Sequence, residues 1–208
     1  MREIVALLAR GGPVMIPLAG CSILALAVVL ERAWTWWRVG PTRDGDAVLT
    51  EAARGEWAAA CRLGEASLSP PARVLAAGIR HRNPAAALAM EAAARHEIAR
   101  LKRFLPVLDT IVTLSPLLGL LGTVTGMIAA FGVMGQSGMN SPHAITGGVA
   151  EALIATAVGL GIAIAALVPL NFFNSRVDTM LETIERYGSR LELVLAETAA
   201  QGRAGSDA

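Results

Sequence analysis

Three polar residues lie inside long apolar runs, where their side chains could handle protons. Glu151 is the only ionisable side chain between Asp109 and Arg176 apart from His143. A carboxylate at membrane depth is costly, and it usually faces a helix-bundle interior or a watery cavity. The alternative is a Glu151 solvated near the outer interface, because it lies only about 10 Å into its predicted span.

Two threonines, Thr123 and Thr156, are the second candidates. They occur in two successive apolar segments that run in opposite directions, about 16 Å and 18 Å from the outer ends of their helices. Both hydroxyls are therefore expected near the middle of the membrane. They can hold water or contact a partner's carboxyl group there, or they can simply bond carbonyls of their own helices. Thr125 faces another way and is expected to bond its own helix.

Glu151 and Thr156 cannot both face one narrow axis. They are five residues apart, which corresponds to about 140° around an α-helix. Either the pore is wide, or one of the two residues faces a neighbouring helix.

Small residues form a stripe on each of the two segments that carry these side chains. Such faces allow helices to approach closely in a membrane, where packing drives association. The predicted packing faces consist of Gly119, Gly122, Gly126, Ala152, Ala155, Gly159 and Ala163. Taken alone, these stripes indicate helix packing and no chemistry.

The elements that must position these residues are membrane spans. The chain has 208 residues, of which 54% are hydrophobic and only 17% are charged, against about 25% charged in ordinary globular domains. Three apolar segments exceed the roughly 20 residues that a helix needs to cross a bilayer core. They lie at residues 13–37, 105–134 and 144–173. The formal net charge of +1 gives no indication of nucleic-acid binding.

The first segment has an alternative interpretation as a cleaved signal sequence, with Arg2 and Arg10 as its basic region. The residues before Cys21 even resemble a lipoprotein cleavage site. The apolar run continues past Cys21, however, and ends in a tryptophan cluster typical of a membrane interface. A spanning helix is therefore the favoured interpretation. No disulfide is expected between Cys21 and Cys61, and no histidine or cysteine cluster has metal-ligand spacing.

The placement of Lys and Arg predicts the orientation. The connection at 38–104 is rich in arginine, whereas the loop at 135–143 contains no Lys or Arg. The positive-inside rule therefore places the connection and the C-terminal segment in the cytoplasm, and the N-terminus in the periplasm. Residues 1–12 are expected as a periplasmic or interfacial segment, and 174–208 as a cytoplasmic helix with a disordered tail from Ala199.

Long cytoplasmic helices are predicted next to the spans. Ser69-Pro70-Pro71 breaks the connection, and a second helix is expected to begin at Pro84 and to run unbroken into the second span at Pro106. The third span is expected to continue as a helix, because the apolar residues beyond it keep helical spacing. The fold class is thus an all-α membrane protein with three transmembrane helices and long cytoplasmic extensions.

Two motifs carry a resemblance to a known family. Residues 114–128, LSPLLGLLGTVTGMI, resemble the second span of ExbB and TolQ proteins, and residues 148–160, GVAEALIATAVGL, resemble the third. Gly11-Gly12-Pro13 and Glu31-Arg32 fit the first span. The likeness extends from about residue 11 to residue 177. The chain is expected to lack the long periplasmic N-terminal extension that some ExbB members have.

The resemblance implies a function. Members of the MotA/TolQ/ExbB family form a homopentamer in the bacterial inner membrane around two copies of a single-span ExbD/TolR-like partner. Thr123 and Thr156 would face an aspartate of that partner, and Glu151 would set the polarity of the pore. Protons are the coupling ion, and no other cofactor is implied. The motion would act on a TonB/TolA-like periplasm-spanning protein.

Several functions remain open on this basis. An ExbB-like motor subunit is favoured, with a TolQ-like or gliding-motor stator as its nearest alternative. A passive membrane scaffold is the alternative from another class, and membrane lipids are expected contacts in either case. An enzyme is not expected, because the sequence shows no nucleophile and base pair, metal cluster or phosphate-binding loop.

Overall fold

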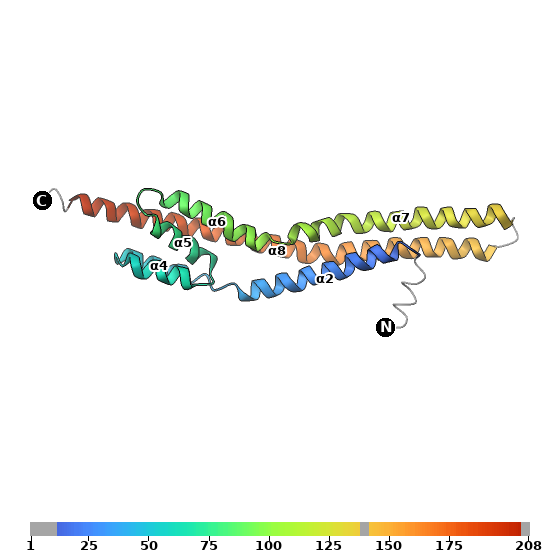
Figure 1. Ribbon diagram of the computed structural model, residues 1–208, viewed down its shortest axis with the longest axis horizontal. Helices are drawn as coiled ribbons and strands as arrows, with labels where there is room; N and C mark the ends of the chain where they lie inside the picture. The colour runs from blue at the N-terminus through green and yellow to red at the C-terminus, as the bar shows by residue number, and fades with distance from the viewer. Residues whose placement is uncertain (1–11, 138–141, 205–208) are drawn as a thin grey trace. The chain divides into compact units, whose positions relative to one another are not determined.

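A computed structural model describes residues 12–137 and 142–204 of the chain. The predictions for the N-terminal segment and the end of the tail lie outside these residues. Within them the protein has seven α-helices and no β-strand, which confirms the predicted all-α class (Figure 1). The helices are α2 (Met15–Arg38), α3 (Asp44–Ala53), α4 (Trp57–Ala66), α5 (Pro70–Arg80), α6 (Ala86–Lys102), α7 (Leu105–Ser137) and α8 (Pro142–Ala204).

The helices divide into two compact units. The first unit contains the described residues up to Arg32 and those of Phe104–Phe173. Its three helices are long and apolar enough to cross a membrane, and their most apolar windows have mean hydropathies of 1.8, 1.8 and 2.4. The candidate spans lie at Met15–Arg38, Leu105–Gly132 and within Thr146–Ala200. Three spans were predicted, and three candidates are found.

Large apolar side chains of the first unit point outward. Ile23, Leu117, Leu153 and Val168 are all more than 60% exposed. Exposed apolar surface of this extent marks contact with lipid or with other protein chains. Many buried positions of α7 and α8 are small residues, such as Ala130, Ala155 and Ala163, so close backbone approach contributes to the packing of this unit.

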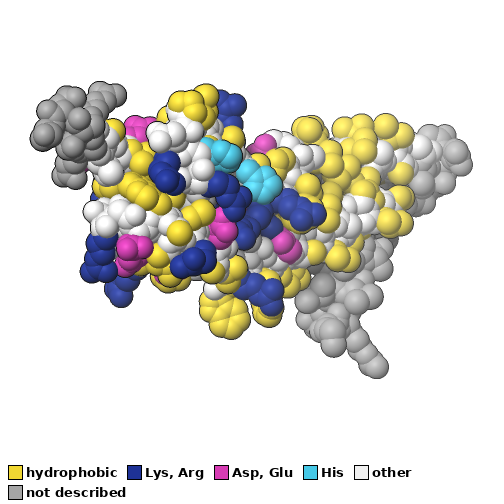
Figure 2. All heavy atoms as spheres, turned by 60° about the vertical axis from the view of Figure 1, so that its left-hand side comes forward, with side chains coloured by type: hydrophobic (Ala, Val, Ile, Leu, Met, Phe, Trp, Pro, Cys, Tyr) yellow, Lys and Arg dark blue, Asp and Glu magenta, His cyan; other side chains and the backbone are white. Residues whose placement is uncertain are grey.

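The second unit contains Ala33–Arg103 and the described residues from Asn174 onward. Helices α3, α4, α5 and α6 pack on one another in succession. The core is an ordinary apolar one, in which Val48, Leu75, Ile79, Leu101 and Leu191 are almost fully buried. On the face drawn in Figure 2, charged side chains gather over this unit, whereas hydrophobic side chains cover the first.

The predicted unbroken helix from Pro84 into the second span is wrong. Helix α6 begins at Ala86 and ends at Lys102, and α7 begins at Leu105. Phe104 between them has a φ of 66°, a left-handed conformation that is uncommon outside glycine. Its ring lies 5.7 Å from the guanidinium carbon of Arg32, a distance typical of a cation–π contact. Pro106, the second residue of α7, has no N–H to donate to the carbonyl of Lys102, the last residue of α6. Pro106 therefore marks a helix start, a local signal that the predicted continuous helix overlooked.

Helix α8 continues without interruption through the end of the third apolar segment, as predicted, and is 63 residues long. It also extends to Ala204, so the disorder predicted from Ala199 is wrong for 199–204. Ala199, Ala200 and Gln201 are strong helix formers, and they prolong a helix that already exists. Helices α7 and α8 extend to Ser137 and Pro142, so the connection between them is shorter than the predicted 135–143.

Candidate functional site

Helices α7 and α8 meet along a seam of small residues. A methyl group built at Gly122 would lie 2.5 Å from the Cβ of Ala155, and one built at Gly126 would lie 2.9 Å from that of Ala152. At Gly159 the methyl would lie 2.5 Å from the backbone oxygen of Ser115. These distances are shorter than van der Waals contact, so the observed approach of the two helices requires glycine at these positions.

Thr156 crosses this seam with its hydroxyl. Its Oγ1 donates a hydrogen bond of 2.8 Å to the backbone carbonyl of Gly119 on α7. A Cβ at Gly119 would lie only 3.0 Å from the Cα of Thr156. The absence of a side chain at Gly119 therefore brings its carbonyl within reach of Thr156.

Thr123 lies one helical turn from Gly119 along α7, and its hydroxyl donates to the carbonyl of Leu120 at 2.7 Å. Thr125 also bonds its own helix, at 2.9 Å to the carbonyl of Leu121. Thr123 and Thr125 thus bond within their own helix, whereas Thr156 bonds between helices. Thr123 and Thr156 are both half-buried.

Glu151 lies on a different side of α8, near the start of α2. A Cβ at Gly12 would come within 2.0 Å of Oε1 of Glu151, and Gly12 has a φ of +72°. Val14, Met15 and Leu18 follow directly and form a buried cluster with Ala155 of α8. The structure therefore separates Glu151 from Thr156, as their spacing predicts, and places Glu151 beside Gly12, just before α2, and Thr156 against α7.

Sequence reasoning missed two members of this arrangement. Gly148 takes part in the seam, since a Cβ there would lie 2.9 Å from that of Ala130. Gly12 was noted only as part of a motif, because nothing in the sequence connects it with a carboxylate 139 positions later. Of the predicted packing residues, Ala152, Ala155 and Ala163 are all buried.

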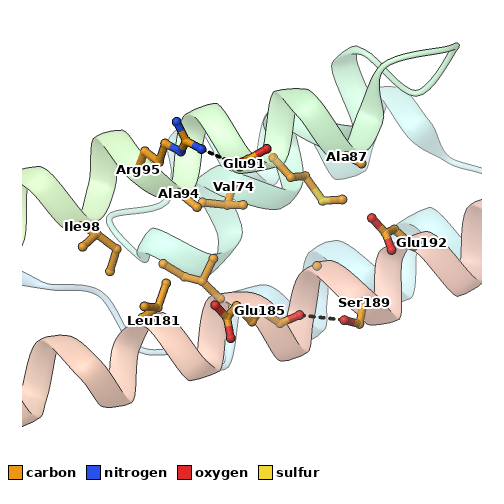
Figure 3. Close-up of a pocket in the computed structure, with 13 residues that line it drawn as sticks. Val74, Ala87, Glu91, Ala94, Arg95, Ile98, Leu181, Glu185, Ser189 and Glu192 are labelled. Carbon is orange, nitrogen blue, oxygen red and sulfur yellow. Dashed lines mark hydrogen bonds and ion pairs between the residues drawn. The ribbon is translucent and has the colours of Figure 1, made fainter.

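The second unit contains a groove of about 440 Å³ between α6 and α8. Met90, Ile98, Leu181 and Ile184 contribute apolar surface to it, and Figure 3 shows an ion pair between Glu91 and Arg95 at its edge. All of its lining residues lie outside the three predicted spans. Within the described ranges, no group of three His, Cys, Asp or Glu side chains could hold a metal ion.

A charged cluster joins α3 to α8 in the second unit. Asp46 accepts hydrogen bonds of 2.8 Å from both Arg190 and Tyr187. The bond from Arg190 lowers the pKa of Asp46 most, and the bond from Tyr187 lowers it further. Burial raises the pKa of Tyr187, and its bond to Asp46 adds to this effect. Gly45 contributes by its lack of a side chain, since a Cβ there would lie 3.0 Å from the Tyr187 ring.

The fold and the site define an all-helical membrane protein in which two spans share a glycine seam crossed by a threonine hydroxyl. Residues 66–186 match the model of the family described as the MotA/TolQ/ExbB proton channel family. The chain is 38% identical over 202 residues to the biopolymer transport protein ExbB-like 1 of Synechocystis sp., covering 90% of this chain and 77% of the relative. The chain belongs to the MotA/TolQ/ExbB proton channel family, a family of channels and not of enzymes.

Shorter matches connect the chain with relatives named TolQ and ExbB. It is 39% identical over 92 residues to the Tol-Pal system protein TolQ of Haemophilus influenzae, covering 44% of this chain and 40% of the relative. It is 40% identical over 98 residues to the biopolymer transport protein ExbB of Xanthomonas campestris, covering 46% and 39%. Similarity at these levels does not separate an ExbB-type role from a TolQ-type role.

Proposed function

We propose that this protein is the channel-forming subunit of an inner-membrane motor that couples the proton motive force to mechanical work on a periplasmic partner. The observation that carries the proposal is the family match over 66–186, because it includes the second and third spans with Thr123, Glu151 and Thr156. The distribution of arginine supports an orientation with the N-terminus in the periplasm and the second unit in the cytoplasm.

The proposed assembly is a homopentamer around two copies of a single-span ExbD/TolR-like protein. Large apolar side chains of the first unit point outward. Helices with such exposed faces are suited to packing against further chains in the membrane. The motion would be passed to a TonB/TolA-like protein. We favour the ExbB-type role, in which the motor energises TonB-dependent transport, and a TolQ-type or gliding-motor role is the alternative.

The threonine hydrogen bonds suggest how the pore would treat a partner's carboxyl group. A carbonyl has no hydrogen to give, so the hydroxyl hydrogens of Thr123 and Thr156 are both used in their bonds to Leu120 and Gly119. Each hydroxyl oxygen retains only acceptor lone pairs. A protonated carboxylic acid can donate to these lone pairs, whereas a carboxylate cannot. At the depth of the two threonines, the pore would therefore favour passage of the partner with its carboxyl group protonated and neutral.

A passive scaffold is the second candidate, and the position of Glu151 is the observation that favours it. Its carboxylate lies against the turn at Gly12, where it can hold the start of α2 in place. If this were its whole role, Glu151→Gln would support energy coupling as well as the wild type at every pH.

The test uses the protein purified together with a single-span ExbD/TolR-like protein from the same organism. Native mass spectrometry is expected to give five copies with two partners, and vesicles containing this complex should take up protons when a potassium diffusion potential is imposed. Thr123→Val and Thr156→Val should abolish uptake without changing the mass. Thr125→Val is the matched control, because it removes a hydroxyl that bonds its own helix.

The outcomes separate the two candidates. Loss of uptake in the Thr123 and Thr156 variants alone supports the motor. A stable complex that takes up no protons in its wild-type form would favour the scaffold. Equal uptake in all four proteins would support a channel but would remove the two threonines from it.

A further inference from the structure

A second carboxylate lies on α7, close to the other end of its span. Asp109 belongs to the candidate span Leu105–Gly132, and its side chain is exposed. Within the described residues the Asp109 carboxylate makes no hydrogen bond or ion pair, although its backbone carbonyl accepts a bond from Thr113 at 3.2 Å. Several other acids are paired, including Glu51 and Glu97, each with a nearby arginine.

Asp109 and Thr123 share a side of α7. They are 14 residues apart, so their directions differ by only about 40° at 3.6 residues per turn. Viewed down the axis of α7, both are rotated in the same direction from Gly119, Thr123 by about 40° and Asp109 by about 80°. Thr113 continues this face, and its hydroxyl is likewise used in bonds to backbone carbonyls, including that of Thr110 at 3.0 Å. The face thus carries a hydroxyl at Thr123, a hydroxyl at Thr113 and a carboxylate at Asp109.

Lipid is an unfavourable neighbour for this face. Acidic side chains within spans usually face a bundle interior or a water-filled cavity, because the hydrocarbon cannot solvate them. Asp109 has no cation to offset its charge among the described residues. Water or a partner chain must therefore lie beside it, and the same surroundings would extend along the face toward Thr123, about 21 Å away along the helix.

We propose that Asp109 is the proton-accepting group at the cytoplasmic end of the pathway, and this inference rests on the proposed function. In this step the O–H bond of the partner's carboxylic acid breaks, water carries the proton along the face, and a new O–H bond forms on Asp109. The partner is left as a carboxylate. Asp109 then returns the proton to cytoplasmic water and becomes a carboxylate again.

This assignment gives the pathway a carboxylate near each end and hydroxyls between them. Glu151 lies on the outer side of the threonine level, and Asp109 lies on the inner side. A group that must both take up and release protons has to be a titratable one, and the hydroxyls between the two carboxylates cannot do this at ordinary pH. The alternative is that Asp109 is only solvated at the membrane surface, where any polar residue would replace it.

The experiment measures initial proton uptake by vesicles containing the complex of this protein with its single-span partner. Asp109→Asn and Asp109→Ser both remove the titratable group, and both should lower the rate at least about tenfold, a modest figure for the loss of a positioned proton carrier. Asp109→Glu should restore the rate to within about twofold. Asp178→Asn, which removes an exposed carboxylate from α8 in the second unit, is the control and should change nothing.

Each other outcome overturns the proposal. Wild-type uptake in Asp109→Asn or Asp109→Ser would show that no titratable group is needed at this position. Loss of uptake in Asp109→Glu as well, with the native mass unchanged, would show that shape matters there and proton acceptance does not. If the wild-type complex itself takes up no protons, the proposed function fails and this inference fails with it. Uptake lost in Thr123→Val but kept in Asp109→Asn overturns this inference alone.

Discussion

The hydroxyl of Thr156 donates a 2.8 Å hydrogen bond to the backbone carbonyl of Gly119, and this bond joins α8 to α7 across a seam of glycines. Hydrogen bonds between spans contribute about 0.6 kcal/mol on average in membrane proteins. Thr156→Val keeps the shape of the side chain and removes the bond, so we expect a small loss of stability of this order. Thr156→Ser should retain both the bond and energy coupling.

Thermal unfolding in detergent measures the first effect, and growth that depends on the powered process measures the second. Thr125→Val serves again as the control for removing a hydroxyl. A Thr156→Ser protein that assembles but does not couple would mean that the methyl group matters more than the oxygen.

A methyl group at Gly159 should force the seam apart. In Gly159→Ala the new Cβ would lie 2.5 Å from the backbone oxygen of Ser115, and backbone cannot turn aside as a flexible side chain can. Overpacking of this kind costs about 1–3 kcal/mol. Unfolding of the assembled protein in detergent should shift to lower temperature accordingly.

Gly161→Ala is the matched control on the same helix. Nothing lies within 4 Å of a Cβ at Gly161, and alanine is the better helix former by about 1 kcal/mol. Its stability should equal or exceed that of the wild type. Equal losses in the two variants would contradict the close approach of α7 and α8 at Gly159.

Gly12 should behave as a partner of Glu151. Gly12→Ala adds a Cβ that would overlap Oε1 of Glu151, and it also places a side chain on a residue with a φ of +72°. The carboxylate must then move, so we expect coupling to fall both in Gly12→Ala and in Glu151→Gln. Coupling assays on the two single variants and on the double variant test this. If the effects are independent and simply add, the contact has no functional role.

The Asp46 cluster should make the second unit sensitive to acid. The pKa of Asp46 is lowered in the folded protein by Arg190 and then by Tyr187. Its stabilisation is therefore complete above the ordinary carboxyl pKa of about 3.9 and is lost as the pH falls through the lower, folded value. The side chain is 53% exposed, so the effect is expected to be below about 1 kcal/mol.

Tyr187 should make the second unit sensitive to alkaline pH. Its pKa is raised on folding, so its contribution is complete below about pH 10 and is lost as the pH rises toward the folded value.

The acid effect of Asp46 can be measured by urea unfolding between pH 3 and 5. The loss of stability with falling pH should be shallower in Asp46→Asn than in the wild type. Asp178→Asn is again the control and should follow the wild type. Identical curves for all three proteins would rule out this linkage.

The sequence allowed the spans to be located, because hydropathy and length decide them directly. The continuation of α8 was also predictable from the spacing of apolar residues such as Val177 and Leu191. The break at Phe104 was missed although Pro106 signals a new helix start, and the left-handed residue beside Arg32 had no signal in the sequence. Spacing showed that Glu151 and Thr156 diverge, but only the packing of α2 and α7 shows which helix each one faces.

Long-range contacts account for the rest of what was missed. Gly12 meets Glu151, and Asp46 meets Tyr187 and Arg190, from positions more than a hundred residues apart. Asp109 is different, because its signal was present in the sequence. Its spacing of 14 residues from Thr123 places both residues on one side of a helix. The polar face that contains Thr123 needed only to be followed from the middle of the span to its first turns.

The glycine seam also restricts how this sequence can change over generations. A methyl gained at Gly122 needs one lost at Ala155, and the same exchange connects Gly126 with Ala152. Single steps along this surface pass through a strained intermediate, so selection should remove most of them. Lineages are expected either to keep both residues of a pair or to exchange them together. The seam should therefore be visible as correlated substitution between two spans, even where neither position is invariant.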